Sequence, residues 1–370
     1  MTSFLRRFYS IAFVLGMSLC ALYAQSTRHR EELAFVANQS SGDLSVYMIK
    51  TNGALAQVSG SPFTAGGSPN SVAVVPSGGF TYVANVLPGG ISAFSVARNG
   101  TLAPLPGSPF PAPTGTAFVT IDPSGRFLYA LNCGSNCSGS GFGNINAYSI
   151  DQQTGSLTSI AGSPIAAGRF PYSLAIDPTG HFAYVANAGS DDVYCFAIDS
   201  HTGSLTQIGL PVAAGTSPLS VIVDPWSQYV YTANTGSNDV SAFSINFDGT
   251  LAAVKGSPFA AGPFVSGVAA SSNGKFVIVA AGSGAFVYKI DGLGALHPVP
   301  GSPFAAGLGP NGVSIDPTNS FVYVVNAGSN DVSAYHFSSG SGKLTPIAKS
   351  PFHAGSFAAG IASAPAPLHE

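Results

Sequence analysis

Tyr184-Val185-Ala186-Asn187 is one of seven copies of a short phrase that decides the fold of this chain. The copies end at positions 38, 85, 132, 187, 234, 281 and 326, and all of these residues are Asn except Ala281. Four of the six intervals are 47 residues long. Self-similarity at a fixed period is the signature of a repeat architecture, in which each copy is one supersecondary unit.

A second phrase keeps the same period. Gly60-Ser61-Pro62-Phe63 recurs, with Ile replacing Phe in one copy, at residues 107–110, 162–165, 256–259 and 301–304. Weaker copies stand at residues 209–212 and 349–352. The two phrases therefore mark two fixed points in each of seven units.

Each unit is predicted to hold four short strands. In one copy these are residues 220–223, 229–233, 240–245 and 251–254, rich in β-branched and aromatic residues and separated by Gly, Pro, Asn and Asp. Some strands, such as Val72-Ala73-Val74-Val75, are apolar on both faces and must be covered on both sides. Blades stacked face to face around an axis meet that requirement.

The two ends of the chain complete one unit between them. The first copy begins near Leu33, already in its second strand, whereas residues 357–363 read as a first strand with nothing after it. Joining them removes both free sheet edges. The sequence predicts an all-β fold: a seven-bladed β-propeller of four-stranded antiparallel blades, its ring closed by the C-terminal strand joining the N-terminal blade. Residues 25–370 are expected to form this single domain.

The composition excludes several other classes of protein. Gly 45 and Pro 27 exclude a helix bundle, because both residues destabilise helices. Hydrophobic residues at 45% against 8% charged residues argue against disorder. With 13 Lys and Arg against 16 Asp and Glu there is no basic field, so no nucleic acid is expected as a partner.

The N-terminus has the order of a secretory signal. Arg6 and Arg7 precede an apolar stretch over residues 8–22, and small and polar residues follow Ala24. We expect residues 1–24 to be a signal peptide and the mature protein to be exported to the periplasm, cell envelope or exterior, without a transmembrane segment. An uncleaved anchor is the alternative, although the stretch is short for a span of about 20 residues. Export would permit a disulfide between Cys133 and Cys137 and leave Cys195 as an odd thiol.

The repeated phrases, the Asp-Pro-Ser-Gly turn at residues 122–125 and the Gly-Ser-Asn-Asp loops resemble those of the seven-bladed lactonase-type propellers. That family includes 6-phosphogluconolactonase-like, cycloisomerase-like and exported YVTN-repeat proteins. The resemblance covers nearly all of the mature chain. It implies hydrolysis of a lactone, such as a sugar lactone, at a central pocket on one face of the ring. Members of the family usually keep His, Arg and Glu in the pocket, whereas Ser71, Ser173, Ser220 and Gly312 stand at the matching positions here.

The repeated Asn residues have two readings. A ring of amides around the axis could bind a carbonyl or a sugar hydroxyl, or each Asn could bond the backbone of its own turn. The candidates for the pocket are Asn70, Asn187, Asn234, Asn311 and Asn326.

The charged candidates also have a structural alternative. Asp122, Asp177, Asp224 and Asp316 precede Pro and are assigned to turns. Asp192, Asp239 and Asp331 could orient a water molecule, although they too recur with the blade. The most informative departure from the repeat is Arg169-Phe170-Pro171-Tyr172, in which Arg169 and Tyr172 could polarise a lactone carbonyl; an exposed Arg covering a blade is the alternative.

Two functions remain open at this stage. The first is an exported lactonase acting on a small lactone, without a cofactor or metal, because no calcium loop or zinc spacing is present. The second is a non-catalytic periplasmic or cell-envelope platform that binds a carbohydrate, other glycan or envelope protein. The scarcity of catalytic residue types favours the second, and the family resemblance favours the first.

Overall fold

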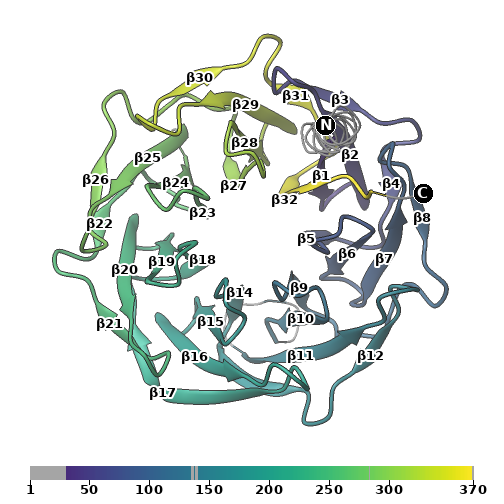
Figure 1. Cartoon of the computed structure of the whole chain (residues 1–370), viewed down its shortest axis with the longest axis horizontal. Coiled ribbons are helices and arrows are strands. Elements are labelled where there is room, and N and C mark those ends of the chain that lie inside the picture. The colour runs from purple at the N-terminus through teal and green to yellow at the C-terminus, as the bar shows by residue number, and fades with distance from the viewer. Residues whose placement is uncertain (1–30, 135–136, 138–140, 283, 369–370) are drawn as a thin grey trace, which may run out of the picture. The chain divides into compact units, whose positions relative to one another are not determined.

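The computed structural model describes residues 31–134, 137, 141–282 and 284–368. In this part of the chain 32 strands form seven antiparallel sheets, all within the compact unit Glu32–Glu370 (Figure 1). The predicted signal peptide, residues 1–24, lies outside the described residues. No helix among the described residues has the length and apolar character needed to cross a membrane.

Each sheet is one blade, with its first strand at the axis and its fourth at the rim (Figure 1). Blade 1 holds β32 (Ala358–Pro365), β1 (Glu32–Asn38), β2 (Asp43–Ile49), β3 (Leu55–Gln57) and the short β4 (Phe63–Thr64). Blade 2 holds β5 (Pro69–Val74), β6 (Phe80–Asn85), β7 (Ile91–Val96) and β8 (Leu102–Pro104). Blade 3 holds β9 (Thr116–Ile121), β10 (Phe127–Asn132), β11 (Phe142–Ile150), β12 (Leu157–Ser159) and β13 (Ile165–Arg169).

The remaining blades follow the same order. Blade 4 holds β14 (Pro171–Ile176), β15 (Phe182–Asn187), β16 (Asp192–Ile198) and β17 (Leu205–Ala213). Blade 5 holds β18 (Pro218–Val223), β19 (Tyr229–Asn234), β20 (Asp239–Ile245), β21 (Leu251–Ala253) and β22 (Phe259–Ala260). Blade 6 holds β23 (Gly267–Ala270), β24 (Phe276–Ala281), β25 (Gly284–Ile290) and β26 (Leu296–Pro298). Blade 7 holds β27 (Pro310–Ile315), β28 (Phe321–Asn326), β29 (Asp331–Phe337), β30 (Leu344–Pro346) and β31 (Phe352–His353).

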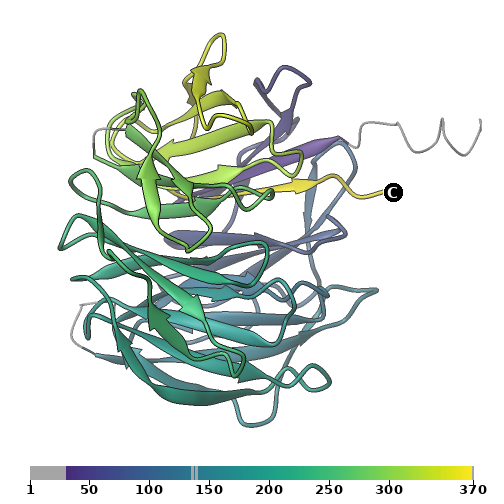
Figure 2. The ribbon, with the colours of Figure 1, turned by 60° about the vertical axis from the view of Figure 1, so that its left-hand side comes forward.

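The predicted ring closure is confirmed. The C-terminal β32 pairs antiparallel with β1, with Leu33 opposite Ala364 and Val36 opposite Ile361 (Figure 2). The bounds match the expectation closely, since β1 begins at Glu32 and β32 at Ala358. The two ends of the chain therefore share one sheet, and neither leaves a free inner edge.

The Ser-Pro-Phe phrase fastens the outer edge of a blade. In six blades the Ser Oγ accepts a hydrogen bond of 2.8–2.9 Å from a backbone N–H of the third strand, as Ser257 does from Ala242. In blade 4 Leu210 replaces this Ser, and β17 instead continues without a break from Leu205 to Ala213. Where the Ser-Pro-Phe phrase is degraded, a longer outer strand thus takes over the pairing with the third strand.

Tyrosines of the second strands join five of the seven blades to the next blade along the chain. The hydroxyl of Tyr231 in blade 5 donates to the carbonyl of Gly294 in blade 6, at 3.1 Å. Four more junctions have the same bond, including the closing one, where Tyr323 donates to Gly53 at 2.9 Å. Because these tyrosines are fully buried, each hydroxyl needs such a partner.

The Asp-Pro residues cap the turns between first and second strands, as predicted. Asp224 is buried, and its carboxylate accepts hydrogen bonds from the backbone N–H of Trp226, Gln228 and Tyr229 at 2.6–3.1 Å. Asp122, Asp177 and Asp316 have the same role. These carboxylates are structural, because their oxygens are occupied by backbone donors.

Candidate functional site

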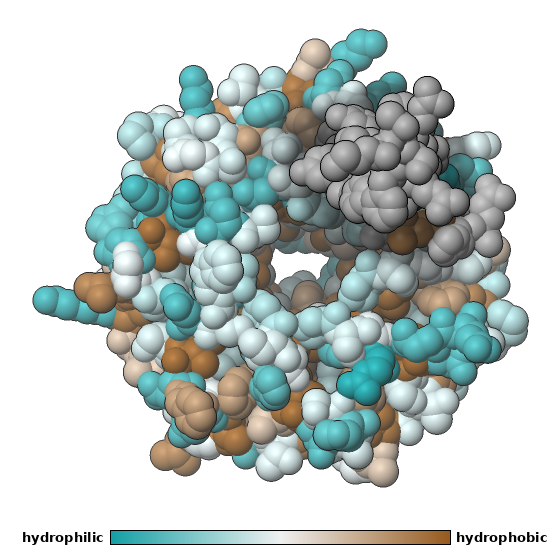
Figure 3. Space-filling model, in the orientation of Figure 1, coloured by the Kyte–Doolittle hydropathy of each residue, from teal (hydrophilic) through white to brown (hydrophobic). Residues whose placement is uncertain are grey.

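All seven inner strands meet around a cavity on the ring axis. Its volume is about 220 Å³, and the axis is open in the space-filling view (Figure 3). The residues that line it come from β5, β9, β14, β18, β23, β27 and β32, and from Ser266 just before β23. The site therefore exists only in the closed ring.

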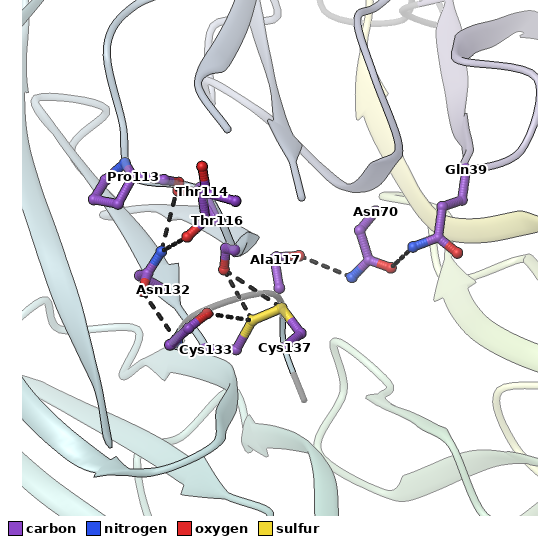
Figure 4. The surroundings of a disulfide bond; sticks show 11 residues. Gln39, Asn70, Pro113, Thr114, Thr116, Ala117, Asn132, Cys133 and Cys137 are labelled. Carbon is purple, nitrogen blue, oxygen red and sulfur yellow. Dashed lines mark hydrogen bonds between the residues drawn. A yellow bond between two sulfur atoms is a disulfide. The ribbon is translucent and has the colours of Figure 1, made fainter. Parts of the chain in front are cut away.

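Three of the predicted residues, Asn70, Tyr172 and Asn311, are brought together here. Each is the second residue of its inner strand. Asn70 Nδ2 donates to the carbonyl of Ala117 at 2.9 Å, and its Oδ1 accepts from Gln39 Nε2 at 3.4 Å (Figure 4). Asn311 Nδ2 donates to the carbonyl of Ala359 at 2.8 Å. Both amides therefore bridge neighbouring blades while they line the cavity.

Tyr172 supplies the phenol of the site. Burial raises the pKa of its hydroxyl, and a hydrogen bond with the Asn70 side chain partly opposes that effect. A phenol is protonated at neutral pH already at its ordinary pKa, and the raised pKa extends this to higher pH, so Tyr172 can act as a hydrogen-bond donor. Its ring also lies 5.7 Å from that of Phe170, which precedes the inner strand.

The serines of the lining are committed to the framework. Ser173 Oγ accepts from the N–H of Val221 at 3.2 Å, and Ser220 Oγ accepts from the N–H of Val268 at 3.3 Å. Ser266 Oγ donates to the carbonyl of Pro310 at 2.8 Å. These bonds join the inner strands of adjacent blades. With no imidazole among the lining residues, none of these serines has an activating base beside it.

Glycines allow the inner strands to approach closely. A Cβ at Gly267 would stand 2.8 Å from the carbonyl oxygen of Asn311, and one at Gly360 would stand 2.7 Å from that of Asn70. Larger residues here would push the blades apart. The sequence analysis did not select Gly267, Gly360 or the lining residues Phe118 and Leu219. Their signal was their place in the repeat: Leu219 stands two residues after Ser217, and Gly267 and Gly360 stand three residues after Phe264 and Phe357, all three of which have φ of 54–56° just before an inner strand.

The other predicted Asn and Asp residues form a motif inside each blade, away from the cavity lining. Asn187, Asn234 and Asn326 are fully buried at the ends of second strands. Their Nδ2 atoms donate to Asp192, Asp239 and Asp331 at 2.8, 2.7 and 2.6 Å. Burial raises the pKa of Asp192, while its bonds from Asn187 and Ser190 act in the opposite direction. These Asn residues therefore form neither the ring of amides around the axis nor bonds to their own turn alone. Each donates to an Asp side chain, Asn234 and Asn326 also donate to a Ser hydroxyl, and Asn187 accepts from the N–H of Gly168.

Arg169 also lies outside the cavity lining. It ends β13 with an exposed side chain, and its guanidinium sits 6.0 Å from the centre of the Phe142 ring. This placement matches the structural alternative, in which the Arg covers a blade. Among the described residues that line the cavity, none carries a formal charge.

A disulfide joins Cys133 and Cys137 after β10 (Figure 4). The Cα atoms are 5.0 Å apart, and Cys133 Sγ lies 2.9 Å from the carbonyl oxygen of Gly115. Gly115 directly precedes the inner strand β9. The disulfide is thereby placed beside an inner strand. Cys195 is a buried free thiol, and the described residues contain no cluster of three metal-ligating side chains.

Known proteins give a consistent picture of the fold. The family model described as lactonase, 7-bladed beta-propeller, matches residues 100–222 and 256–359, more than half of the chain. A search of curated proteins finds no significant match.

Several solved structures share the architecture at low sequence identity. A candidate 6-phosphogluconolactonase of Bacteroides uniformis aligns at 15% identity and a TM-score of 0.75, covering 90% of this chain and 100% of its own. A second, from Bacteroides fragilis, aligns at 20% identity and 0.73, covering 91% and 99%. The periplasmic gluconolactonase of Pseudomonas aeruginosa aligns at 16% identity and 0.74, covering 91% and 100%. At such identities the likeness concerns the fold.

Proposed function

The chain belongs to the family of seven-bladed β-propeller lactonases, and on that premise we propose that it hydrolyses a neutral lactone in the axial cavity. The observation that carries the proposal is the convergence of Asn70, Tyr172 and Asn311 on a cavity without charged lining residues. Hydroxyl and amide groups recognise the ring oxygens of a sugar-like lactone, and the aliphatic walls accommodate its carbon skeleton.

Tyr172 is the group that we assign to the carbonyl of the substrate. Its phenol, protonated at neutral pH and above, would donate a hydrogen bond to the carbonyl oxygen as negative charge develops there. The oxygen of a hydroxide ion forms a bond to the carbonyl carbon, the bond from that carbon to the ring oxygen breaks, and the ring oxygen takes up a proton from solvent water. The product is a hydroxy acid.

The neutral lining also affects substrate choice and product release. A phosphorylated sugar lactone would bring about two negative charges to a cavity that offers no cation in return, at a large desolvation cost. The carboxylate product is disfavoured for the same reason and should leave readily. We therefore propose an unphosphorylated substrate.

The proposal is tested by following acid release from glucono-1,5-lactone and simple alkyl lactones at constant pH. Tyr172→Phe should lower kcat/KM by about 10²-fold, the usual effect of removing one donor to a developing oxyanion. Tyr194→Phe, a change on the third strand of the same blade, is the matched control and should retain the rate.

The pH profile supplies a second criterion. Because no carboxylate or imidazole lines the cavity, the rate should rise about tenfold per pH unit with hydroxide concentration. A bell-shaped profile would contradict this mechanism, since it would require a titrating side chain. If no lactone is hydrolysed faster with the protein than in buffer alone, the proposed activity is wrong.

The second candidate function is binding without turnover. It is favoured by the bonds that already commit the lining serines and amides to the neighbouring blades. A neutral carbohydrate or an envelope protein would then be the ligand. Calorimetric binding of a sugar lactone in the absence of acid release would select this function over hydrolysis.

We also propose that the protein is exported after removal of residues 1–24. The charged, apolar and small-residue order of the N-terminus supports this, and a disulfide suits an oxidising compartment. Intact mass of the protein from a periplasmic or culture fraction should correspond to a chain beginning at Gln25. A full-length mass in the cytosolic fraction would contradict export.

A further inference from the structure

A second cavity continues the axial cavity toward the opposite face of the ring. Its volume is about 340 Å³, and it is lined by residues of β18, β23 and β27 together with Pro225. Ile222, Val268 and Val313 line both cavities, so the two are parts of one channel. The opening through the ring in Figure 3 agrees with this continuity.

The two parts of the channel differ in chemistry. The second cavity is lined mainly by aliphatic side chains and has no charged residue. Its single hydroxyl, on Ser314, is 2.8 Å from the hydroxyl of Ser363 in the neighbouring blade and is already bonded there. The amides and the phenol of Asn70, Tyr172 and Asn311 line only the first cavity.

Aliphatic side chains of the second cavity remain partly exposed although the ring surrounds them. Ile222, Val313 and Ile315 are each only half-buried. Apolar surface of this kind is unfavourable in contact with water and gains free energy when another apolar group covers it. A channel with two amides and a phenol among the side chains at one end, and with aliphatic side chains and a single serine at the other, can hold an amphiphilic molecule.

We propose that the ligand is a neutral lactone with a linear alkyl tail. Its ring occupies the first cavity beside Tyr172, and its tail lies along β18, β23 and β27 in the second. The head-group assignment rests on the proposed function, whereas the tail assignment rests on the aliphatic lining. β23 and β27 each give three consecutive residues to the second cavity, and three residues of a strand span about 10 Å, enough for a medium-length alkyl chain.

The test is direct binding, measured by calorimetry, of lactones with tails of zero, four and eight carbons. Each added methylene should tighten Kd by about three- to fourfold while it is buried. Octyl and butyl glucosides, which are not lactones, serve as probes that cannot be hydrolysed by this reaction and should show the same dependence on tail length. Equal affinity for all tail lengths would overturn the inference.

Blocking the second cavity gives an independent result. Ala269→Trp on β23 should lower affinity for the eight-carbon lactone at least tenfold relative to the unsubstituted lactone. Ala252→Trp, on the exposed outer strand β21, adds the same side chain away from the channel and should leave this ratio unchanged. If Ala269→Trp does not fold, Ile315→Thr is the alternative, because it introduces no larger side chain. It should reduce the same ratio about threefold.

The outcomes separate the two proposals. Affinity that depends on tail length without acid release would retain the amphiphilic ligand and remove hydrolysis. Acid release from all lactones with no dependence on tail length would retain hydrolysis and remove the tail-binding role of β18, β23 and β27.

Discussion

Blades 5 and 6 share the same arrangement of four strands but differ in the polar side chains that stabilise them by hydrogen bonds. Blade 5 has the full set of repeated polar residues, each buried and bonded, whereas blade 6 has smaller or apolar residues at the same places. The matched pairs are Asp224 and Ser271, Tyr231 and Ile278, and Asn234 and Ala281.

In blade 6 other side chains of the same turn accept some of the equivalent hydrogen bonds. Ser271 Oγ accepts from the N–H of Phe276 at 2.9 Å, and Asn273 Oδ1 accepts from that of Lys275 at 3.1 Å. Two neutral side chains thus accept from two of the three N–H groups whose equivalents in blade 5 bond the carboxylate of Asp224. Ile278 and Ala281 are fully buried, so their backbone pairing and packing suffice. The repeated polar residues therefore stabilise single blades, and a blade can form with other residues in their places.

The largest expected effect is at Asp224. Asp224→Ala leaves three backbone N–H groups without their acceptor and should lower the free energy of unfolding by about 3 kcal/mol. Chemical denaturation measures it. The double variant Asp224→Ser with Trp226→Asn copies blade 6 and should recover more than half of the loss. No recovery would show that blade 6 depends on something other than these two residues.

Tyr231 offers a smaller contrast. Tyr231→Ile copies Ile278, loses the bond to Gly294 and leaves unfilled volume, and should cost about 2 kcal/mol. Tyr231→Phe removes only the hydroxyl and should cost about 1 kcal/mol, which separates the hydrogen bond from the packing. Thermal denaturation of both variants checks this, and equal losses would assign the whole effect to the bond.

A third contrast involves Glu32, which holds the place of Gln228 in blade 5 and Lys275 in blade 6. Burial, and then the charge of Asp316 and a hydrogen bond with it, raise the pKa of Glu32 to about 7. Between its ordinary value of 4.5 and about 7, the folded protein keeps a proton that the unfolded chain releases. Stability should therefore fall as pH rises through this window.

Glu32→Gln, which copies blade 5, should remove that fall. The difference between wild type and variant should reach about 1 kcal/mol above pH 7, a value reduced from the full shift because solvent screens the carboxylates. Urea denaturation at pH 5 and pH 8 measures it. The same fall in the variant would place the titrating group elsewhere.

The smallest expected effect concerns the residue that leads into the inner strand. Phe264 in blade 6 has φ 56° and is 72% exposed, whereas Ser217 holds the equivalent place in blade 5 with φ 54°. A bulky residue is strained in this left-handed region, and Gly is not. Phe264→Gly should raise stability by about 0.5 kcal/mol in thermal denaturation, since the N–H still bonds Asn238. A loss instead would show that the Phe264 ring packs usefully against Gly282.

Much of the fold could be predicted from the sequence, because each blade is a local unit. The strand predicted over residues 229–233 is β19, Tyr229–Asn234, and that over 240–245 is β20, Asp239–Ile245. The turn role of Asp224 also followed from its neighbour Pro225, since both act within a few residues.

The candidate site was predicted only in part. Asn70 and Asn187 were both candidates for the pocket, yet Asn70 lines the channel and Asn187 is buried within its blade. Arg169 departs most clearly from the repeat, yet its side chain lies over Phe142. These differences follow from strand position, because only the innermost strand of each blade borders the axis.

The sequence determined the repeat, the number of blades and the meeting of the two chain ends, because each copy carries its own strand and turn signals and the incomplete first and last copies complement each other. The channel, its neutral lining and the placing of two amides and a phenol at one end of it were decided by the tertiary structure. Its walls come from strands spaced around 47 residues apart in the sequence. Those strands become neighbours only when the last strand pairs with the first blade and the ring closes.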